Sequence, residues 1–188
     1  AETDSAPPVA SRSGVVLSVE QEEDKSWTVK TDHGKYLIHY NLKPLVEAGD
    51  RIELGQVLAE GAPVNTKEIA NSLGLGYARQ MFTETLNSSI LIHNGIAPHQ
   101  RNIEVLAKEL YKYVEVLSDT GDWLKGDNIT LQEALPVIRE KSVDISIDKV
   151  QEGQLLGDNT GDHLALDVIS EAMLDKFRKQ GLKTVKVL

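Results

Sequence analysis

The sequence predicts an α+β protein, with β structure in both flanking regions and helices between them. Three observations lead to this prediction. Apolar and polar residues alternate from Gly14 to Ala59, the apolar spacing becomes helical from Asn65 to Val114, and strand-like segments return after Val114. The chain has 188 residues, 40% apolar and 26% charged, which is the composition of a globular protein with a substantial core. Its longest apolar runs are too short to cross a bilayer.

Charge and cysteine content exclude several classes of function. The net charge is −9, and no cluster of Lys and Arg marks the basic face that an autonomous nucleic-acid-binding domain carries. The sequence contains no cysteine, which excludes disulfides, thiol catalysis and zinc sites built from cysteine. We therefore expect any contact with nucleic acid to depend on partners.

Residues 1–12 have the composition of a disordered lead. The stretch AETDSAPPVASRSG mixes Pro, Ala, Ser and acidic residues, so it has little apolar surface to bury. It lacks the apolar core of a signal peptide and begins with Ala1 rather than Met. We expect residues 1–12 to be disordered, and the chain to be a processed or excised part of a longer one.

Residues 13–64 are expected to form a compact set of strands. The segments GVVLSVEQ and SWTVKTD flank the charged turn EEDK, which is the pattern of a β-hairpin. KYLIHYNL is a third strand, which Pro44 ends. VEAGDRIELGQVLAEG then places Gly49, Asp50 and Gly55 at turns around the short strand RIEL.

Residues 65–116 are expected to form two antiparallel helices. The loop HNGIAPHQR joins them, with Asn94-Gly95 as its turn and Pro98 near the start of the second helix. A connection of this length allows antiparallel packing. The face predicted for the first helix carries Ala78, Met81, Phe82, Thr85 and Ser89. The stripe predicted for the second carries Ile103, Leu106, Ala107, Leu110 and Val114.

Residues 117–188 are expected to return to β structure and to end in a helix-strand module. The Gly-Asp turn at Gly49 has a counterpart at Gly121, so the flanking regions could be halves of one pseudo-symmetric barrel. In the tail, Gly181 is placed as a C-cap glycine and LKTVKVL as a closing strand. The helical face predicted before this glycine consists of Leu166, Ile169, Met173 and Phe177.

His39 is the candidate for chemistry in the first half of the chain. Between Ile38 and Tyr40 on a strand, it is interpreted first as a hydrogen-bonded histidine at a barrel surface. GKYLIHYNL followed by VEAGDRIELGQVL also resembles the active-site strand of the IIA phosphocarrier of the sugar phosphotransferase system. That resemblance implies a neutral imidazole that accepts a phosphoryl group, supported by a second histidine on a neighbouring strand. The upstream histidine here is His33, and phosphorylation of His39 is kept as an alternative function.

The remaining patterns are interpreted as structural. Lys25 in EEDKSW resembles the lysine turn of lipoate and biotin carriers, but it precedes the turn at Gly49 instead of following it. LGLGYAR lacks the third glycine of a dinucleotide loop and predicts a helix kink or a loop at a helix entry. His93 and His99 have no carboxylate pair nearby, and the acids around His163 are out of register for a calcium loop. We therefore expect no catalytic residues, no cofactor and no metal.

A longer resemblance covers the chain from Ser13 to about Leu131. It consists of four segments in order: SGVVLSV, VEAGDRIELGQVLAEGAP, LGLGYARQMFTETLNSSILIHNGIAPHQRNIEVLAKEL and VEVLSDTGDWLKGDNITL. These resemble the largest (β′) subunit of multisubunit RNA polymerase of bacteria, plastids and phages, in the region after the trigger loop. The run from Asn94 to Leu106 is the most specific part. The resemblance implies a barrel-sandwich hybrid over 13–64, with the jaw-like helical pair 65–116 inserted.

This resemblance implies a noncatalytic jaw-region component of a DNA-directed RNA polymerase that helps position downstream DNA and the trigger loop. No Asp-Phe-Asp-Gly-Asp run occurs here, so the chain lacks the aspartates that hold magnesium for nucleotidyl transfer. The implied partners are other polymerase subunits, downstream DNA within the assembled enzyme, and transcription regulators, with no membrane. The implied location is the cytoplasm or the plastid stroma. A free-standing protein-binding module is a further alternative.

Overall fold

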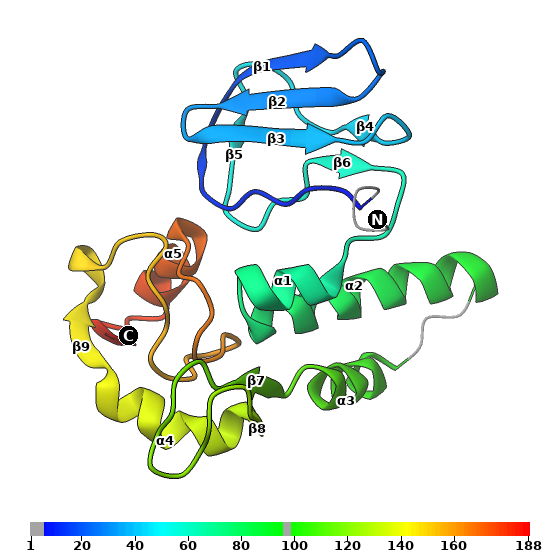
Figure 1. Ribbon diagram of the computed structural model, residues 1–188. Coiled ribbons are helices and arrows are strands. Elements are labelled where there is room, and N and C mark those ends of the chain that lie inside the picture. The colour runs from blue at the N-terminus through cyan, green and yellow to red at the C-terminus, as the bar shows by residue number, and fades with distance from the viewer. Residues whose placement is uncertain (1–5, 96–98) are drawn as a thin grey trace.

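The structure, a computed structural model, describes residues 6–95 and 99–188, with residues 91–94 described by their backbone alone. Within these residues the chain has five α-helices and ten β-strands, and the predicted α+β class is confirmed. A β unit stands at the top of Figure 1, with the helices below it and the C-terminal unit at the lower left. None of the described helices combines the length and apolarity that a bilayer crossing requires.

The N-terminal β unit is a curled antiparallel sheet with the spatial order β3-β2-β1-β5. Its strands are β1 (Gly14–Gln21), β2 (Trp27–Thr31), β3 (Gly34–Ile38) and β5 (Arg51–Ile52). A shift of register between Val16 and Ser18 interrupts the ladder, and such a shift increases the local bend of a sheet. A second pair lies beside this sheet and consists of β4 (Lys43–Pro44) and β6 (Ala59–Glu60).

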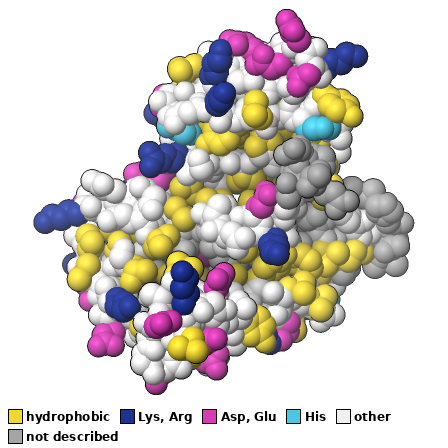
Figure 2. Space-filling view, viewed as in Figure 1, with side chains coloured by type: hydrophobic (Ala, Val, Ile, Leu, Met, Phe, Trp, Pro, Cys, Tyr) yellow, Lys and Arg dark blue, Asp and Glu magenta, His cyan; other side chains and the backbone are white. Residues whose placement is uncertain are grey.

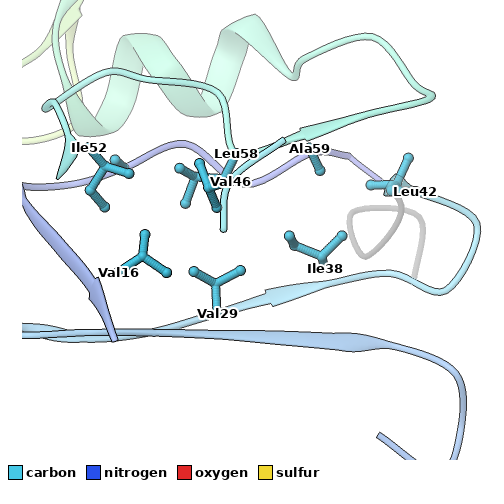
Figure 3. Close-up of a cluster of buried hydrophobic side chains, with 9 residues drawn as sticks. Val16, Val29, Ile38, Leu42, Val46, Ile52, Leu58 and Ala59 are labelled. Carbon is cyan, nitrogen blue, oxygen red and sulfur yellow. The ribbon is translucent and has the colours of Figure 1, made fainter. Parts of the chain in front are cut away.

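These strands enclose one apolar core. Figure 3 shows Val16, Val29 and Ile38 directed from the sheet toward Ile52 and Leu58 on the opposite side. All five side chains are at most 1% exposed. Each fully buried side chain of this size stabilises the fold by about 1.5–3 kcal/mol. The alternation seen in the sequence therefore corresponds to a real inside and outside of the β unit.

The predicted disordered lead is wrong for residues 8–10. The Ala10 N–H donates to the Gln56 carbonyl at 2.8 Å, and the Ala10 carbonyl accepts from the Gly55 N–H at 2.8 Å. Ala10 itself is 0% exposed, and Val9 forms a β-bridge with Val57. Composition missed this because the segment is held by backbone hydrogen bonds and small side chains. Residues 1–5 lie outside the described residues.

The third strand is shorter than predicted. β3 ends at Ile38, and the Leu42 N–H donates to the His39 carbonyl at 2.9 Å, which closes a turn instead of continuing the strand. The turn brings Leu42, 3% exposed, into the core of the β unit. His39 therefore lies in a turn at the end of β3. Pro44, predicted to end this strand, belongs to the separate pair β4–β6.

Two helices and a break replace the single first helix of the predicted pair. α1 (Thr66–Ser72) begins at Asn65, whose side chain accepts from the Lys67 and Glu68 N–H groups. α2 (Leu75–Asn94) and α3 (Gln100–Leu110) then run antiparallel and contact each other (Figure 1), so an antiparallel pair is present as predicted. The predicted start at Pro98 lies outside the described residues.

The predicted apolar stripe of α3 is only partly covered. Ile103 and Ala107 are 2% and 1% exposed, whereas Leu106 and Leu110 are 52% and 60% exposed. The helix therefore packs on α2 through one part of its stripe and leaves another part open. A helix pair without a third element cannot bury a wider face.

Helix α4 (Leu131–Lys141) was not predicted. It begins with a capping box, in which the Thr130 hydroxyl accepts from the Glu133 N–H and the Glu133 carboxylate accepts from the Thr130 N–H. Buried residues at helical spacing follow, among them Leu131, Leu135 and Ile138. Pro136 inside the helix and the strand-like NITL before it hid this pattern, although the box itself is a recognisable signal.

The C-terminal module joins a helix to a closing strand, as predicted. β9 (Val143–Ser146) is followed by the 3₁₀ turn Ile147–Lys149, the helix α5 (Glu171–Lys179) and β10 (Thr184–Val187). β10 pairs antiparallel with β9. Gly181 has φ 78°, as a C-cap glycine requires. The predicted helical face is wrong for Leu166 and Ile169, because Ser170 caps α5 after them.

The predicted pseudo-symmetric barrel does not form in the described residues. β7 (Tyr113–Glu115) and β8 (Asn128–Thr130) pair with each other in a separate two-stranded sheet. The turn at Gly121 therefore closes its own small hairpin. Similar Gly-Asp turns at Gly49 and Gly121 reflect shared turn chemistry, not one barrel.

Candidate functional site

At the break between α1 and α2, the helical part of the chain packs against the C-terminal part. Gly74 has φ +115°, a backbone conformation that side chains rarely adopt. A Cβ at Gly74 or at Gly76 would overlap the carboxylate of Asp167, which comes from the C-terminal part of the chain. The two glycines of LGLGYAR therefore leave room for a packed acid. The predicted helix kink is confirmed, with Asp167 as its physical reason.

Asp167 caps α2 from a distance of 91 residues in the sequence. Its Oδ1 accepts from the Gly76 N–H at 2.8 Å and its Oδ2 accepts from the Leu164 N–H at 2.9 Å. The first N–H groups of a helix lack partners inside the helix, and the positive end of the helix dipole favours a carboxylate. Burial raises the pKa of Asp167 to about 6, although the two N–H donors and Arg79 oppose this rise.

Further hydrogen bonds fix the same junction. The Tyr77 hydroxyl donates to the Val168 carbonyl at 2.8 Å, and the Val168 N–H donates to the Leu73 carbonyl at 2.8 Å. Arg79 donates through Nε and Nη2 to the Tyr111 carbonyl at 2.9 and 2.6 Å, just after α3. Burial lowers the pKa of Arg79. These bonds tie α1, α2, the end of α3 and the segment before α5 together, and we call this set the helical junction.

A groove lies beside the helical junction, between α2, α3 and the loop 161–164. Its volume is about 680 Å³. Basic side chains (Arg79, Lys108 and Lys176) and acidic side chains (Glu84, Glu104 and Asp162) line it together. The balanced charges give no preference for a polyanion such as nucleic acid.

His163 lines the same groove and is held by aromatic rings. Its ring centroid lies 6.3 Å from that of Tyr77 and 5.8 Å from that of Phe177. Burial lowers the pKa of His163, which favours the neutral imidazole. Asp162 pairs with Lys176 at 2.7 Å and does not join His163 in a ligand set. No group of three His, Asp or Glu side chains placed to hold a metal occurs in the described ranges.

The structure places His33 and His39 at opposite ends of β3. His33 contacts Asp32 Oδ1 at 3.0 Å through Nδ1 and the Tyr36 hydroxyl at 2.9 Å through Nε2. His39 bonds to Asn41 through Nδ1 and lies against Tyr40, with ring centroids 4.2 Å apart. The strand between the two histidines keeps their rings apart, so they do not form a phosphoryl site together.

The surroundings of His39 are acidic. The charged residues that line the cleft beside it are Glu22, Glu23, Asp24 and Glu68, with Lys35 as the one basic side chain among them. Carboxylates repel a phosphoryl group, and within the described part of the chain His33 does not reach this cleft. Phosphorylation of His39 stays a prediction that this geometry does not favour.

The other residues singled out in the sequence also have structural surroundings. Lys25 is exposed in the β1–β2 turn, with φ 68°, and its N–H donates to the Glu22 carbonyl. His99 precedes α3 as its N-cap residue without a side-chain cap bond. The side chain of His93 lies outside the described residues. Lys25 and His99 therefore do not belong to one site.

Comparison with known proteins finds sequence similarity to the β′ subunit of RNA polymerase. No protein-family model matches the chain. The β′ subunit of DNA-directed RNA polymerase from Renibacterium salmoninarum is 29% identical over 119 residues, which are 61% of this chain and 9% of that subunit. The β′ subunit from Deinococcus radiodurans is 28% identical over 120 residues, 61% of this chain and 8% of the subunit. That from Thermus thermophilus is 29% identical over 111 residues, 58% of this chain and 7% of the subunit.

Over about three fifths of its length, this chain is similar to a region of the RNA polymerase β′ subunit. The matches come from distantly related bacteria, and together they confirm the resemblance that the sequence motifs indicated. The β′-like chain spans less than a tenth of the length of these relatives. The activity of the whole enzyme therefore does not transfer to this chain by similarity alone.

The sequence reasoning missed Asp167, although one signal could have found it. Asp167 is the single charged residue of the apolar stretch LALDVI, and it is 0% exposed. A carboxylate in such a stretch needs hydrogen-bond donors, because burying an unpaired charge is costly. The donors are the Gly76 and Leu164 N–H groups. Because Gly76 lies 91 residues from Asp167, the sequence alone does not show that its N–H contacts this carboxylate.

Proposed function

We propose that this chain is a noncatalytic, jaw-region part of a β′-like subunit of DNA-directed RNA polymerase. In the assembled enzyme it helps position downstream DNA and the trigger loop, and it acts through its contacts with the other subunits. The β unit would serve as the barrel-sandwich hybrid of that region. The helical pair α2–α3 would serve as the inserted jaw-like element.

The similarity to β′ subunits from several bacteria is the observation that carries this proposal. It extends over about three fifths of the chain, at 28–29% identity in three of the relatives. A match of this length covers more than one small motif, so it supports descent of a folded region and not a chance pattern.

The physical properties of the chain fit a scaffold. Asp167 and Arg79 link the helical junction across long sequence distances, which fixes the helices relative to the C-terminal module. The net charge of −9 disfavours unaided contact with phosphates. Among the described residues, no three His, Asp or Glu side chains are placed to hold a metal ion such as the magnesium of nucleotidyl transfer. The chain would therefore act by positioning other parts of the enzyme.

Reconstitution tests the proposal. The remaining polymerase subunits encoded in the same genome are assembled with and without this chain, and RNA synthesis is measured on a template with a downstream duplex. We expect the chain to co-elute with the assembly, and its omission to slow elongation and shorten the nuclease footprint on downstream DNA. An assembly that neither retains the chain nor changes its activity would contradict the proposal.

His39→Ala is the control variant for this experiment. In a scaffold, the exposed turn that holds His39 is not needed for chemistry, so co-elution and elongation should stay unchanged. Incorporation of a phosphoryl group into the wild-type chain, lost in His39→Ala, would instead support the phosphocarrier alternative.

A further inference from the structure

The β unit leaves one strand edge without a neighbour. β3 is the last strand of the order β3-β2-β1-β5, so among the described strands none pairs with its outer edge. The Asp32 N–H, at the end of β2, donates to β1, so Thr31 bonds toward β3, opposite Gly34. Because backbone groups alternate in direction along a strand, the N–H and carbonyl groups of Lys35 and Leu37 point outward.

A second backbone edge belongs to the segment before β1. Pro8 and Ala10 both bond to the chain around Val57, which forms an antiparallel β-bridge with Val9. When the residues on either side of a bridge make its hydrogen bonds, the backbone groups of the central residue point the other way. The N–H and carbonyl of Val9 are therefore directed away from Val57.

One cleft lies between these two edges. Val9, Lys35 and Leu37 all line it, and its volume is about 1040 Å³. Figure 1 shows the segment before β1 running below β3, with α1 beneath it. The Ser11 N–H donates to the Tyr36 hydroxyl at 3.0 Å, so a side chain links the two edges at one end. In the described residues no backbone ladder joins them, which leaves the β unit open at this point.

The charged side chains of the cleft are mostly acidic. Glu22, Glu23, Asp24 and Glu68 line it together with Lys35. Within residues 6–95 and 99–188, no ion pair uses Glu22, Glu23 or Glu68. Their uncompensated charge attracts a cationic partner and repels nucleic acid. Figure 2 shows acidic side chains gathered on the upper part of the molecule, where the β unit lies.

We propose that this cleft binds an extended, basic segment of another protein, which adds a strand to the β unit. The segment would bond to Lys35 and Leu37 on one side and to Val9 on the other. Free strand edges bind peptides in this way, through backbone bonds that give affinity and side-chain contacts that give specificity. Leu37 is 65% exposed and offers an apolar contact, while Glu22 and Glu23 select Lys or Arg. The inference does not depend on the proposed role in RNA polymerase.

A synthetic peptide tests strand addition. The probe is a capped, fluorescent peptide of four Lys-Val repeats, and anisotropy measures its binding to the full chain at low salt. One control peptide has Glu in place of Lys, and another carries N-methyl groups on its valines. We expect micromolar binding of the Lys-Val peptide, a loss of about tenfold on N-methylation because ladder bonds are removed, and no binding of the Glu-Val peptide. Equal binding of the methylated peptide, or no binding of the Lys-Val peptide, would overturn the inference.

Substitutions in the chain test the two parts of the cleft. Leu37→Pro removes an N–H that β2 does not use and should weaken binding about tenfold, whereas Leu37→Ala keeps this N–H and should lose less. Glu22→Gln combined with Glu23→Gln should weaken binding about threefold at low salt. Glu47→Gln combined with Glu53→Gln, which changes the net charge equally outside the cleft, is the matched control.

Far-ultraviolet circular dichroism and urea unfolding show which variants are folded, and the methylated peptide tests the wild-type chain even where Leu37→Pro does not fold. Equal losses in the two double variants would mean that net charge alone attracts the peptide, which would overturn the site.

Two other occupants of the cleft are detected in the same experiments. A second copy of this chain would bring like charges together, so we expect a monomer in light scattering. A dimer that Leu37→Pro dissociates would assign the edge to self-association and overturn the inference. A chain that starts at Ala6 should bind the peptide like the full chain. Binding that appears only in this shorter chain would assign the cleft to residues 1–5 and would also overturn the inference.

Discussion

The N-terminal β unit and the α2–α3 pair solve the burial of apolar side chains in opposite ways. The β unit encloses its own core, in which Ile38 and Leu58 are 0% exposed. The helical pair leaves Leu106 and Leu110 more than half exposed, and it is held at one end by the helical junction. A curled sheet can wrap around its interior, whereas two helices have no third layer. The first region therefore stabilises itself, and the second depends on its neighbours.

The largest expected effect comes from replacing one leucine by alanine in each of the two regions and comparing the losses in the free energy of unfolding. Leu58→Ala should lower the free energy of unfolding by about 3 kcal/mol, because it removes buried methyl groups and leaves a cavity. Leu110→Ala should lower it by less than about 0.5 kcal/mol, because its side chain already contacts water. Urea denaturation measures both. Similar losses at the two positions would show that the exposed leucine is packed in solution.

The helical junction gives the next largest effect. Asp167→Ala should lower the free energy of unfolding at pH 7 by about 2 kcal/mol, since the Gly76 and Leu164 N–H groups lose their buried acceptor. Asp162→Ala in the same loop is the control, because its carboxylate is 83% exposed in a surface ion pair and should cost little. An unchanged midpoint for Asp167→Ala would mean that α2 does not need this cap.

The pH dependence of stability sharpens the role of the same carboxyl. Burial raises the pKa of Asp167 from 3.8 to about 6, so the folded chain binds this proton more tightly than the unfolded chain. The contribution of Asp167 to the free energy of unfolding is therefore full below pH 4 and is lost as the pH rises to about 6. Wild type should gain roughly 1–2 kcal/mol over Asp167→Asn when the pH falls from 6.5 to 4.

His163 contributes with the opposite sign, which is why the variant at Asp167 serves as the reference. Burial lowers the pKa of His163, so protonation below its ordinary value of 6.5 disfavours the folded chain. This contribution is the same in wild type and in Asp167→Asn and largely cancels in their difference. A difference that stays flat from pH 4 to 6.5 would contradict the raised pKa of Asp167.

The smallest expected effect lies in α4, away from both regions. Thr130→Ala removes one half of the capping box and should lower the free energy of unfolding by about 1 kcal/mol. Thr130→Ser keeps the hydroxyl and is the control. Thermal unfolding followed by circular dichroism detects the shift, and equal midpoints for the two variants would show that the cap is replaced by water.

Local patterns predicted much of the fold, and long-range contacts account for most of the errors. The β-hairpin, the antiparallel helices and the closing strand depend on neighbours in the sequence, so periodicity and turn residues were sufficient. Residues 8–10 and Asp167 depend on partners far along the chain, at Gln56 and Gly76. Helix α4 was hidden by Pro136, even though its capping box is a local signal.

For the candidate site as well, local features could be predicted from the sequence and long-range contacts could not. The sequence identified the kink at Leu73–Arg79, but it could not supply the acid that explains both glycines. The resemblance to β′ subunits was visible in ordered motifs and is confirmed by the relatives. The exposure of Leu106 and Leu110 was not predictable, because helical spacing indicates which residues share a face and not what covers that face.

The backbone bonds of residues 8–10 bear on how this protein should be cloned. A designer who trusted composition would start the expressed chain at Ser13. This would remove the Pro8 carbonyl, which accepts from the Leu58 N–H, and the Ala10 N–H, which donates to the Gln56 carbonyl. The bared edge at Val57 would then be free to recruit strands from other molecules, a common route to insoluble material. Boundaries drawn ahead of Pro7 keep that edge occupied.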